Sequence, residues 1–295
     1  MNDADQAYNK NRARQRFLKE LPNKTVLYFI LISCSIVFGL PLIWMISTSL
    51  KPGSEAFRFP PNFIPNPIVW ENYIKGLTYL PFGKYILNTL LIIIPRTIAA
   101  VGVSALVAYG FSRIEWDGRD ILFFICVATM VIPFAVTMIP LYLLFHRLGW
   151  VGTYLPLIVP SLFAEPYFIF LIRQFFMGIP QELSDAARVD GCSEFMIFWK
   201  IILPLSKPVL AVVALFQFMW TWGDYMGPLI YLNDPNKFTV SLGLAQFGSN
   251  WRGATLDRYV WFMAAITAMT LPVLIVFFLV QRMFIEGISL TGLKG

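Results

Sequence analysis

The stretch PQELSDAARVDGCSEFMIFWKIILPLSKP, residues 180–208, determines how the rest of the chain is interpreted. It is polar but has helical spacing, and apolar runs long enough to cross a membrane flank it on both sides. Asp190-Gly191 predicts the end of a first helix, because glycine tolerates the left-handed conformation that closes a helix. Ser193 can cap a second helix, which we expect to continue to Pro204. This segment, called the elbow below, is therefore expected to form a knob at a membrane surface, suited to docking in a groove on a soluble partner.

Each expected helix of the elbow has an apolar side. In the first helix, Asp185 and Arg188 are expected on one face, with an apolar face beside them. The residues of that apolar face are Leu183, Ala186 and Ala187. The residues expected along one side of the second helix are Phe195, Phe198 and Ile202.

The elbow resembles the EAA loop of permease subunits of ABC importers, in which E-A-A is followed by three residues, a glycine and later a proline pair. The matching positions are Asp185, Ala186, Ala187, Asp190, Gly191, Phe195, Ile202, Pro204 and Pro208. The chain departs from the pattern at Asp185, where Glu is usual, and at Cys192, where Ala is usual. Both changes are conservative in charge or size. The resemblance implies coupling to ATPase subunits through Asp185, Ala186, Ala187, Asp190, Gly191 and Pro204; the alternative is an ordinary amphipathic loop.

The composition is that of a membrane protein. Of the 295 residues, 57% are hydrophobic and only 14% charged, whereas about a quarter of the residues in soluble domains are charged. The net charge of +6 is therefore treated as an orientation signal, and we expect no nucleic-acid partner. With one histidine, three scattered cysteines and no P-loop motif, we expect no metal site, no cofactor and no enzymatic activity in this chain.

Six apolar runs predict an all-α polytopic membrane protein with six transmembrane helices. The runs are 26–50, about 85–111, 121–145, 153–177, 208–231 and 259–281. The basic segment 1–25 is expected to be a cytoplasmic tail, and an even number of crossings returns the tail 282–295 to the same side. Segments expected inside hold fourteen Lys and Arg residues, against eight outside, and this bias agrees with cytoplasmic termini and a cytoplasmic elbow.

The segments between and within the spans carry further expectations. Residues 51–84 are rich in Pro, Asn and aromatic residues, and we expect an extended periplasmic loop there. The permease core is expected over 85–281. Prolines inside the spans predict bends around a cavity, although membrane helices in general are richer in proline than soluble ones.

Three ionisable residues lie within the expected spans: Arg96, Glu165 and Asp224. Such residues are costly in hydrocarbon and are functional candidates by default. From the helical rise, Arg96 and Glu165 are expected at one level, roughly 17–18 Å from the outer surface, and Asp224 in the outer third of the membrane. Two interpretations stay open: a structural Arg96–Glu165 ion pair, which the penalty on unpaired buried charge favours, or an Arg96 that faces a cavity and contacts an anionic or polyhydroxyl substrate.

The fifth span is the most aromatic part of the chain: FQFMWTWGDYMGPLIYL, residues 216–232. Helical spacing places Phe216, Trp220 and Asp224 on one stripe, and Phe218, Trp222 and Tyr225 on the next. Aromatic faces can stack on sugar rings while Gln217 and Asp224 bind hydroxyls; the alternative is an interfacial aromatic belt. This segment is similar to the fifth helix of carbohydrate-importer permeases of the maltose type, which favours a sugar. The candidates for the substrate path are Gln217, Trp220, Trp222, Asp224, Tyr225, Arg96 and Glu165.

The resemblance extends from Lys51 to Gly295 and includes a glycine-rich tail, GISLTGLKG, which departs from the family at Thr291 and Gly292. It implies a type I (MetI-like) permease subunit in a bacterial inner membrane. The implied partners are a second homologous permease, two cytoplasmic ATP-binding subunits, an external solute-binding protein, membrane lipid and an oligosaccharide. Alternatives are a permease for an anionic oligosaccharide of the alginate kind, a glycerophosphodiester or a polyamine. A self-sufficient secondary transporter and a membrane scaffold are rivals from other classes.

Overall fold

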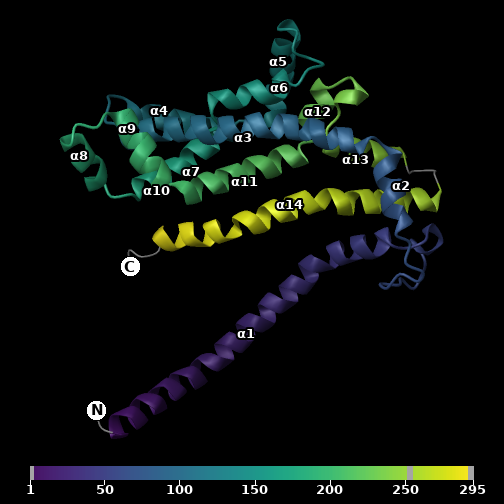
Figure 1. Cartoon of the computed structure of the whole chain (residues 1–295), viewed down its shortest axis with the longest axis horizontal. Coiled ribbons are helices and arrows are strands. Elements are labelled where there is room, and N and C mark those ends of the chain that lie inside the picture. The colour runs from purple at the N-terminus through teal and green to yellow at the C-terminus, as the bar shows by residue number, and fades with distance from the viewer. Residues whose placement is uncertain (1–2, 251–254, 292–295) are drawn as a thin grey trace.

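A computed structural model describes residues 3–250 and 255–291, and every regular element in these residues is helical (Figure 1). Four helical segments are long and apolar enough to cross a membrane: Thr25–Ser49, Phe82–Ser112, Leu155–Met177 and Leu256–Gln281. Two bent pairs bring the total to six: Arg119–Val131 with Phe134–Arg147, and Glu194–Leu205 with Lys207–Gly223. The structure thus provides a counterpart for each expected span. The end of the glycine-rich tail, residues 292–295, lies outside the described residues.

The long helices, apart from the N-terminal half of the first, lie side by side (Figure 1). They are α1 (Asp3–Ser49), α3 (Phe82–Ser112), α7 (Pro166–Met177), α11 (Lys207–Gly223) and α14 (Leu256–Thr291). Helix α3 packs against α7 and α11, and α14 packs against α11, α1 and α2. Small buried residues of α3, including Ala100, Ala105 and Ala108, let its neighbours approach closely, as is common between membrane helices. Helix α1 joins the bundle only near its C-terminal end, and its N-terminal half lies away from the other helices (Figure 1).

The elbow lies at one end of this bundle, which we call the elbow end. It comprises α8 (Glu182–Val189), α9 (Glu194–Ile197), a π-helical turn η4 (Phe198–Ile202) and α10 (Leu203–Leu205). The N-terminus of α1 and the last turns of α14 point toward the same end (Figure 1). The opposite, far end carries η1 (Gly53–Glu55), α2 (Glu71–Tyr79), η5 (Pro235–Lys237) and α13 (Val240–Asn250).

Three of the expected spans are interrupted, and proline is present at each interruption. The third divides into α4 (Arg119–Ala128), η2 (Thr129–Val131) and α5 (Phe134–Arg147), with a bend of 96° where Pro133 removes a backbone donor and restricts Ile132. The fourth divides into α6 (Leu155–Ile158), η3 (Val159–Phe163) and α7, which begins at Pro166. The fifth ends as α11 at Gly223 and resumes as α12 (Met226–Tyr231), which contains Pro228. The bends place helix breaks around a cavity, described below.

The expectation of an extended loop over 51–84 is wrong for its second half. Residues 71–79 form α2, which packs on α14, and α3 already begins at Phe82. Gly76 explains the packing, because a β-carbon at this position would lie 2.4 Å from the carbonyl oxygen of Trp261. The side chain of Asn72 holds the start of α2 to the end of α1 by donating to the carbonyl oxygens of Ser49 and Lys51, at 3.0 and 2.8 Å.

Candidate functional site: the elbow and a charged cavity

The glycine turn of the elbow has the geometry that its sequence predicts. Gly191 has a φ of +80°, in the left-handed region that glycine adopts without strain. Its N–H donates to the Arg188 carbonyl at 3.0 Å and the Cys192 N–H donates to the Ala187 carbonyl at 2.9 Å, which together form a Schellman cap. The Ser193 hydroxyl then accepts from the Met196 N–H at 3.3 Å. The helix end, the turn and the second cap are confirmed.

The predicted apolar faces of the elbow are only partly correct. In α8 the buried residues are Ser184 and Ala187, whereas Leu183 and Ala186 are exposed. In the second helix Phe198 and Ile202 are buried but Phe195 is exposed. Helical spacing predicts which residues share a face, but it does not predict which face packs against the bundle. The result is a set of outward-facing apolar side chains on the elbow: Leu183, Val189, Phe195, Met196 and Trp199.

A chain of charged contacts joins the elbow to α3. The Tyr109 hydroxyl of α3 donates to Glu194 Oε2 at 2.6 Å, and Glu194 Oε1 accepts from Arg188 Nε at 2.7 Å. Arg188 Nη1 also contacts Asp185 Oδ1 at 2.7 Å. The hydrogen bond to Glu194 raises the pKa of Arg188. The sequence predicted Asp185 on the same face as Arg188. It did not predict the contact with Tyr109, because Tyr109 lies 85 residues from Glu194 in the chain.

Arg113, at the end of α3, holds the end of α7 and the start of the elbow. Its side chain is buried, with 4% of the residue exposed, and burial lowers its pKa. Its guanidinium donates to Gln181 Oε1 at 2.7 Å, to the Ile179 carbonyl at 2.6 Å and to the Phe176 carbonyl. One cation therefore satisfies three acceptors between the last turn of α7 and the start of α8, and the sequence alone did not single it out.

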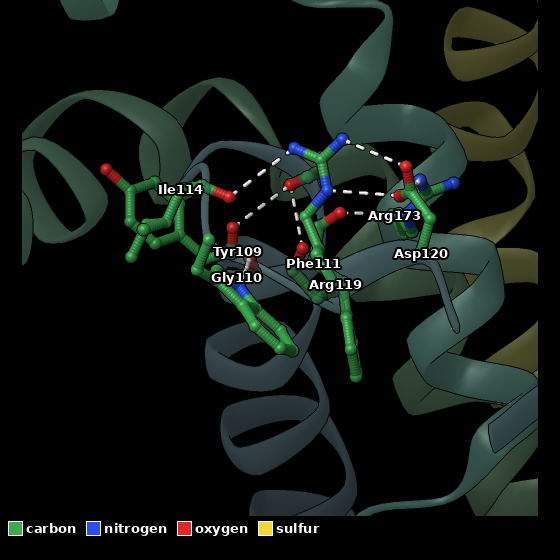
Figure 2. Close-up of polar contacts among 10 residues, drawn as sticks. Tyr109, Gly110, Phe111, Ile114, Arg119, Asp120 and Arg173 are labelled. Carbon is green, nitrogen blue, oxygen red and sulfur yellow. Dashed lines mark hydrogen bonds and ion pairs between the residues drawn. The ribbon is translucent and has the colours of Figure 1, made fainter. Parts of the chain in front are cut away.

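A second group of polar contacts surrounds the turn that follows α3 (Figure 2). Arg173 of α7 donates from Nε to the Phe111 carbonyl at 3.0 Å, and its Nη2 lies 3.5 Å from Asp120 Oδ1. Arg119 contacts the same Asp120 oxygen at 3.1 Å and donates to the Ile114 carbonyl at 3.4 Å. At the elbow end, α3 is thus tied to α4, α7 and α8.

Near the middle of the bundle, Arg96 of α3 contacts two carboxylates. Its Nη2 lies 3.7 Å from Glu165 Oε1 and its Nη1 lies 3.8 Å from Asp224 Oδ2. Glu165 immediately precedes α7 and Asp224 immediately follows α11, so both carboxylates lie at helix breaks. The expected Arg96–Glu165 pair is confirmed.

The expected position of Asp224 relative to Arg96 is wrong, because the side chains of the two residues are in contact. Helix α11 has 17 residues, and Arg96 through Ser112 of α3 is also 17 residues, so both stretches are about 25 Å long. Asp224 therefore lies level with Arg96 when the two helices start from the same end. The error came from counting the depth of Arg96 from the outer end of its span and that of Asp224 from the inner end, although α3 has 31 residues and α11 only 17.

The three charged residues line a cavity of about 1100 Å³. The rest of its wall is largely apolar and includes Leu141, Phe145, Leu157, Phe163 and Tyr231. Trp220 also lines the cavity with 47% of the residue exposed, and its ring is stacked on Phe168 at a centroid distance of 5.0 Å. Arg96 is therefore paired and also lines the cavity, and its contact with a substrate stays a prediction.

The structure places the other candidates of the fifth span away from the cavity wall. Gln217 is fully buried and donates to Thr221 Oγ1 at 2.9 Å. Trp222 is buried and donates from Nε1 to the Met269 carbonyl of α14 at 3.1 Å. Tyr225 is partly exposed but does not line the cavity. The path proposed below therefore retains Trp220 and Asp224 from this span, together with Arg96 and Glu165.

Within the described part of the chain, no group of three or more His, Cys, Asp or Glu residues could hold a metal ion.

Comparison with known proteins agrees with the fold. The chain is 34% identical over 262 residues to the arabinooligosaccharides transport system permease protein AraQ of Halalkalibacterium halodurans, covering 86% of this chain and 91% of that protein. It is 32% identical to AraQ of Bacillus subtilis, covering 91% and 94%. A solved bacterial ABC transporter involved in the import of the acidic polysaccharide alginate matches with a TM-score of 0.77 and 23% identity, over 90% of this chain and 97% of that one.

The likeness to the solved transporter shows the fold, which is the expected all-α, MetI-like permease fold. A family model described as "Binding-protein-dependent transport system inner membrane component" matches residues 98–289, which include the charged residues Glu165 and Asp224 and the whole elbow. The chain therefore belongs to the family of inner membrane components of binding-protein-dependent transport systems, the permease subunits of ABC importers.

Proposed function

We propose that this permease forms half of the path by which a bacterial importer takes up an oligosaccharide. The observation that carries the proposal is the cavity at the three helix breaks, where the half-exposed Trp220 lies beside the charged residues. A ring supported from behind by Phe168 offers a flat apolar surface for a sugar ring. Carboxylate oxygens are strong acceptors for sugar hydroxyls. The arabinooligosaccharide transporters among the relatives support the same class of solute.

The proposed orientation places the elbow, the N-terminus and the C-terminus in the cytoplasm, and the far end with α2 and α13 outside. Two ATP-binding subunits then dock on the elbows of this chain and of a second, homologous permease. The outward-facing apolar residues of the elbow, such as Val189, Phe195 and Trp199, suit such an interface. Asp185, Ala186, Ala187, Asp190, Gly191 and Pro204 keep their proposed coupling role. The solute-binding protein docks at the far end.

Helix α3 provides the proposed mechanical link between the ATP-binding subunits and the cavity. It is continuous from Phe82 to Ser112 despite Pro95, and it carries Arg96 at the cavity and Tyr109 at the elbow. Because Tyr109 and Arg113 fasten the elbow to this rod, a displacement of the elbow moves α3 as a unit. The contacts of Arg96 with the two helix breaks then change, and the cavity switches its access from one side to the other.

Trp220→Ala is the variant that tests the role of the cavity. We expect uptake of arabinotriose by the reconstituted importer to fall about tenfold, because an aromatic contact of about 1.5 kcal/mol is lost. The measurement is ATP-dependent uptake into proteoliposomes that contain all subunits and the binding protein. Trp220→Phe retains a ring on Phe168 and should keep most of the uptake. ATP hydrolysis should persist in both variants, because the elbow is unchanged.

Two outcomes would count against the proposed function. Full uptake by Trp220→Ala would remove the cavity from the path. Uptake by this chain alone, without ATP-binding subunits, would instead indicate a self-sufficient transporter.

A further inference from the structure

The charged residues of the cavity wall have a specific balance of charge. Of the residues that line the cavity, the ionisable acids and bases are Arg96, Glu165 and Asp224. The cavity wall therefore carries one guanidinium and two carboxylates, and its net charge is −1 when both carboxylates are ionised. With one of them protonated the net charge is zero. The wall that this chain contributes offers no surplus of positive charge to an anionic solute.

The guanidinium of Arg96 is already engaged by the protein. Nη1 faces Asp224 and Nη2 faces Glu165, while Nε is buried and has no partner among the described residues. The side chain is 20% exposed, whereas the Glu165 and Asp224 side chains are 27% and 28% exposed. The two acidic side chains are therefore slightly more exposed than the cation that they hold.

The backbone is arranged to present both carboxylates. Ala164, just before Glu165, has φ +60° and ψ 155°, a conformation that is strained for any residue except glycine and that tends to occur at functional sites. Glu165 follows at the N-terminus of α7, where the helix dipole favours a negative charge. Asp224 Oδ1 accepts from the Gly227 N–H at 3.0 Å. A β-carbon at Gly227 would lie 2.7 Å from Asp224 Oδ2, so glycine leaves space for the carboxylate.

We propose that Glu165 and Asp224 form a charge filter, which admits oligosaccharides without negative charge and disfavours anionic ones. Hydroxyls of a neutral sugar donate to the carboxylate oxygens while its ring stacks on Trp220. An anionic oligosaccharide or a phosphodiester meets carboxylates instead of a free cation. The inference rests on the proposed function of the cavity. It predicts that this chain disfavours an acidic polysaccharide, although its fold is that of an alginate importer.

The test compares two solutes on the same protein sample, so that the ratio does not depend on the fraction of folded protein. The purified complex of both permeases and the ATP-binding subunits is titrated with arabinotriose and with trigalacturonate, without the binding protein. Binding is measured by equilibrium dialysis at low salt. The variants are Glu165→Gln and Asp224→Asn, each of which leaves one carboxylate to pair with Arg96. Glu55→Gln, at the far end and outside the cavity, is the matched control for loss of one negative charge.

Removing one unit of charge at about 6 Å, in surroundings intermediate between protein surface and water, changes binding about tenfold. We expect the wild type to prefer arabinotriose. Each cavity variant should shift the ratio about tenfold toward trigalacturonate, and Glu55→Gln should leave it unchanged. Equal binding of both solutes by the wild type, or an unchanged ratio in both variants, would overturn the filter while leaving the oligosaccharide path intact. A wild type that binds neither solute would contradict the proposed function and the filter with it.

Discussion

Arg96→Met is expected to lower the yield of folded permease sharply and to abolish uptake. Arg96 is the cation that compensates Glu165 and Asp224 at the centre of the bundle. Removing one partner from a fully buried ion pair costs about 3–5 kcal/mol, because the remaining charge has no compensation. The carboxylates here are roughly a quarter exposed, so we expect a smaller loss of about 2–3 kcal/mol. That is a large fraction of the stability of a typical domain.

A neutral triple variant separates the charge effect from a loss of packing. Arg96→Met combined with Glu165→Gln and Asp224→Asn leaves no unpaired charge in the cavity, and we expect it to recover most of the folded yield without recovering uptake. Yield is measured by size-exclusion chromatography in detergent after expression at equal levels. A folded and fully active Arg96→Met protein would show that the cation is dispensable for both stability and transport.

Arg113→Met is expected to loosen the elbow and to uncouple ATP hydrolysis from uptake. Arg113 is almost fully buried, and its guanidinium satisfies the carbonyls of Phe176 and Ile179 and the side chain of Gln181. Methionine fills much of the same volume but leaves these acceptors without a charged donor. Each such loss costs about 1–3 kcal/mol, so we expect a total destabilisation of about 3–5 kcal/mol at the elbow end.

Hydrogen exchange and coupled transport measure the two consequences of Arg113→Met. Amide exchange of residues 176–184 should accelerate, and the solute transported per ATP hydrolysed should fall. Arg113→Lys should be intermediate, because an ammonium cannot reproduce the fork of the guanidinium. Arg119→Met, at the start of α4 and at the same end of the bundle, is the matched control. Its partner Asp120 is exposed, and exposed pairs are worth about 0–1 kcal/mol. Unchanged exchange and coupling in Arg113→Met would contradict the role of Arg113.

Local chemistry predicted the elbow well, because its turn depends on neighbouring residues. Gly191 and Ser193 each act over three or four residues, and both adopt the geometry that their sequence context implies. The side of α8 that meets the bundle was not predictable in this way. It depends on Ala187 packing into the apolar cluster at the elbow end, which is a property of the assembled helices.

The cavity was predicted in part. Ionisable residues within apolar runs singled out Arg96, Glu165 and Asp224, and the pairing of Arg96 with Glu165 followed from the penalty on isolated charge. The third member was misplaced because the depths of Arg96 and Asp224 were counted from opposite ends of helices that differ in length. Gln217 and Trp222 share the polar and aromatic chemistry of a sugar site, yet both are used in helix packing. Sequence spacing could not distinguish these uses, because the neighbours of α11 come from distant parts of the chain.

The orientation of the elbow relative to the membrane is the claim on which the coupling to ATP-binding subunits depends, and cysteine labelling tests it most directly. In a background without Cys34, Cys126 and Cys192, one variant carries Val189→Cys on the elbow and another carries Phe59→Cys at the far end. These positions are 87% and 92% exposed. In cells that express the permeases without the ATP-binding subunits, a membrane-impermeant maleimide should label Phe59→Cys in spheroplasts, and should label Val189→Cys only after the membrane has been opened. Labelling of Val189→Cys in intact spheroplasts, with Phe59→Cys protected until the membrane is opened, would contradict the proposed coupling.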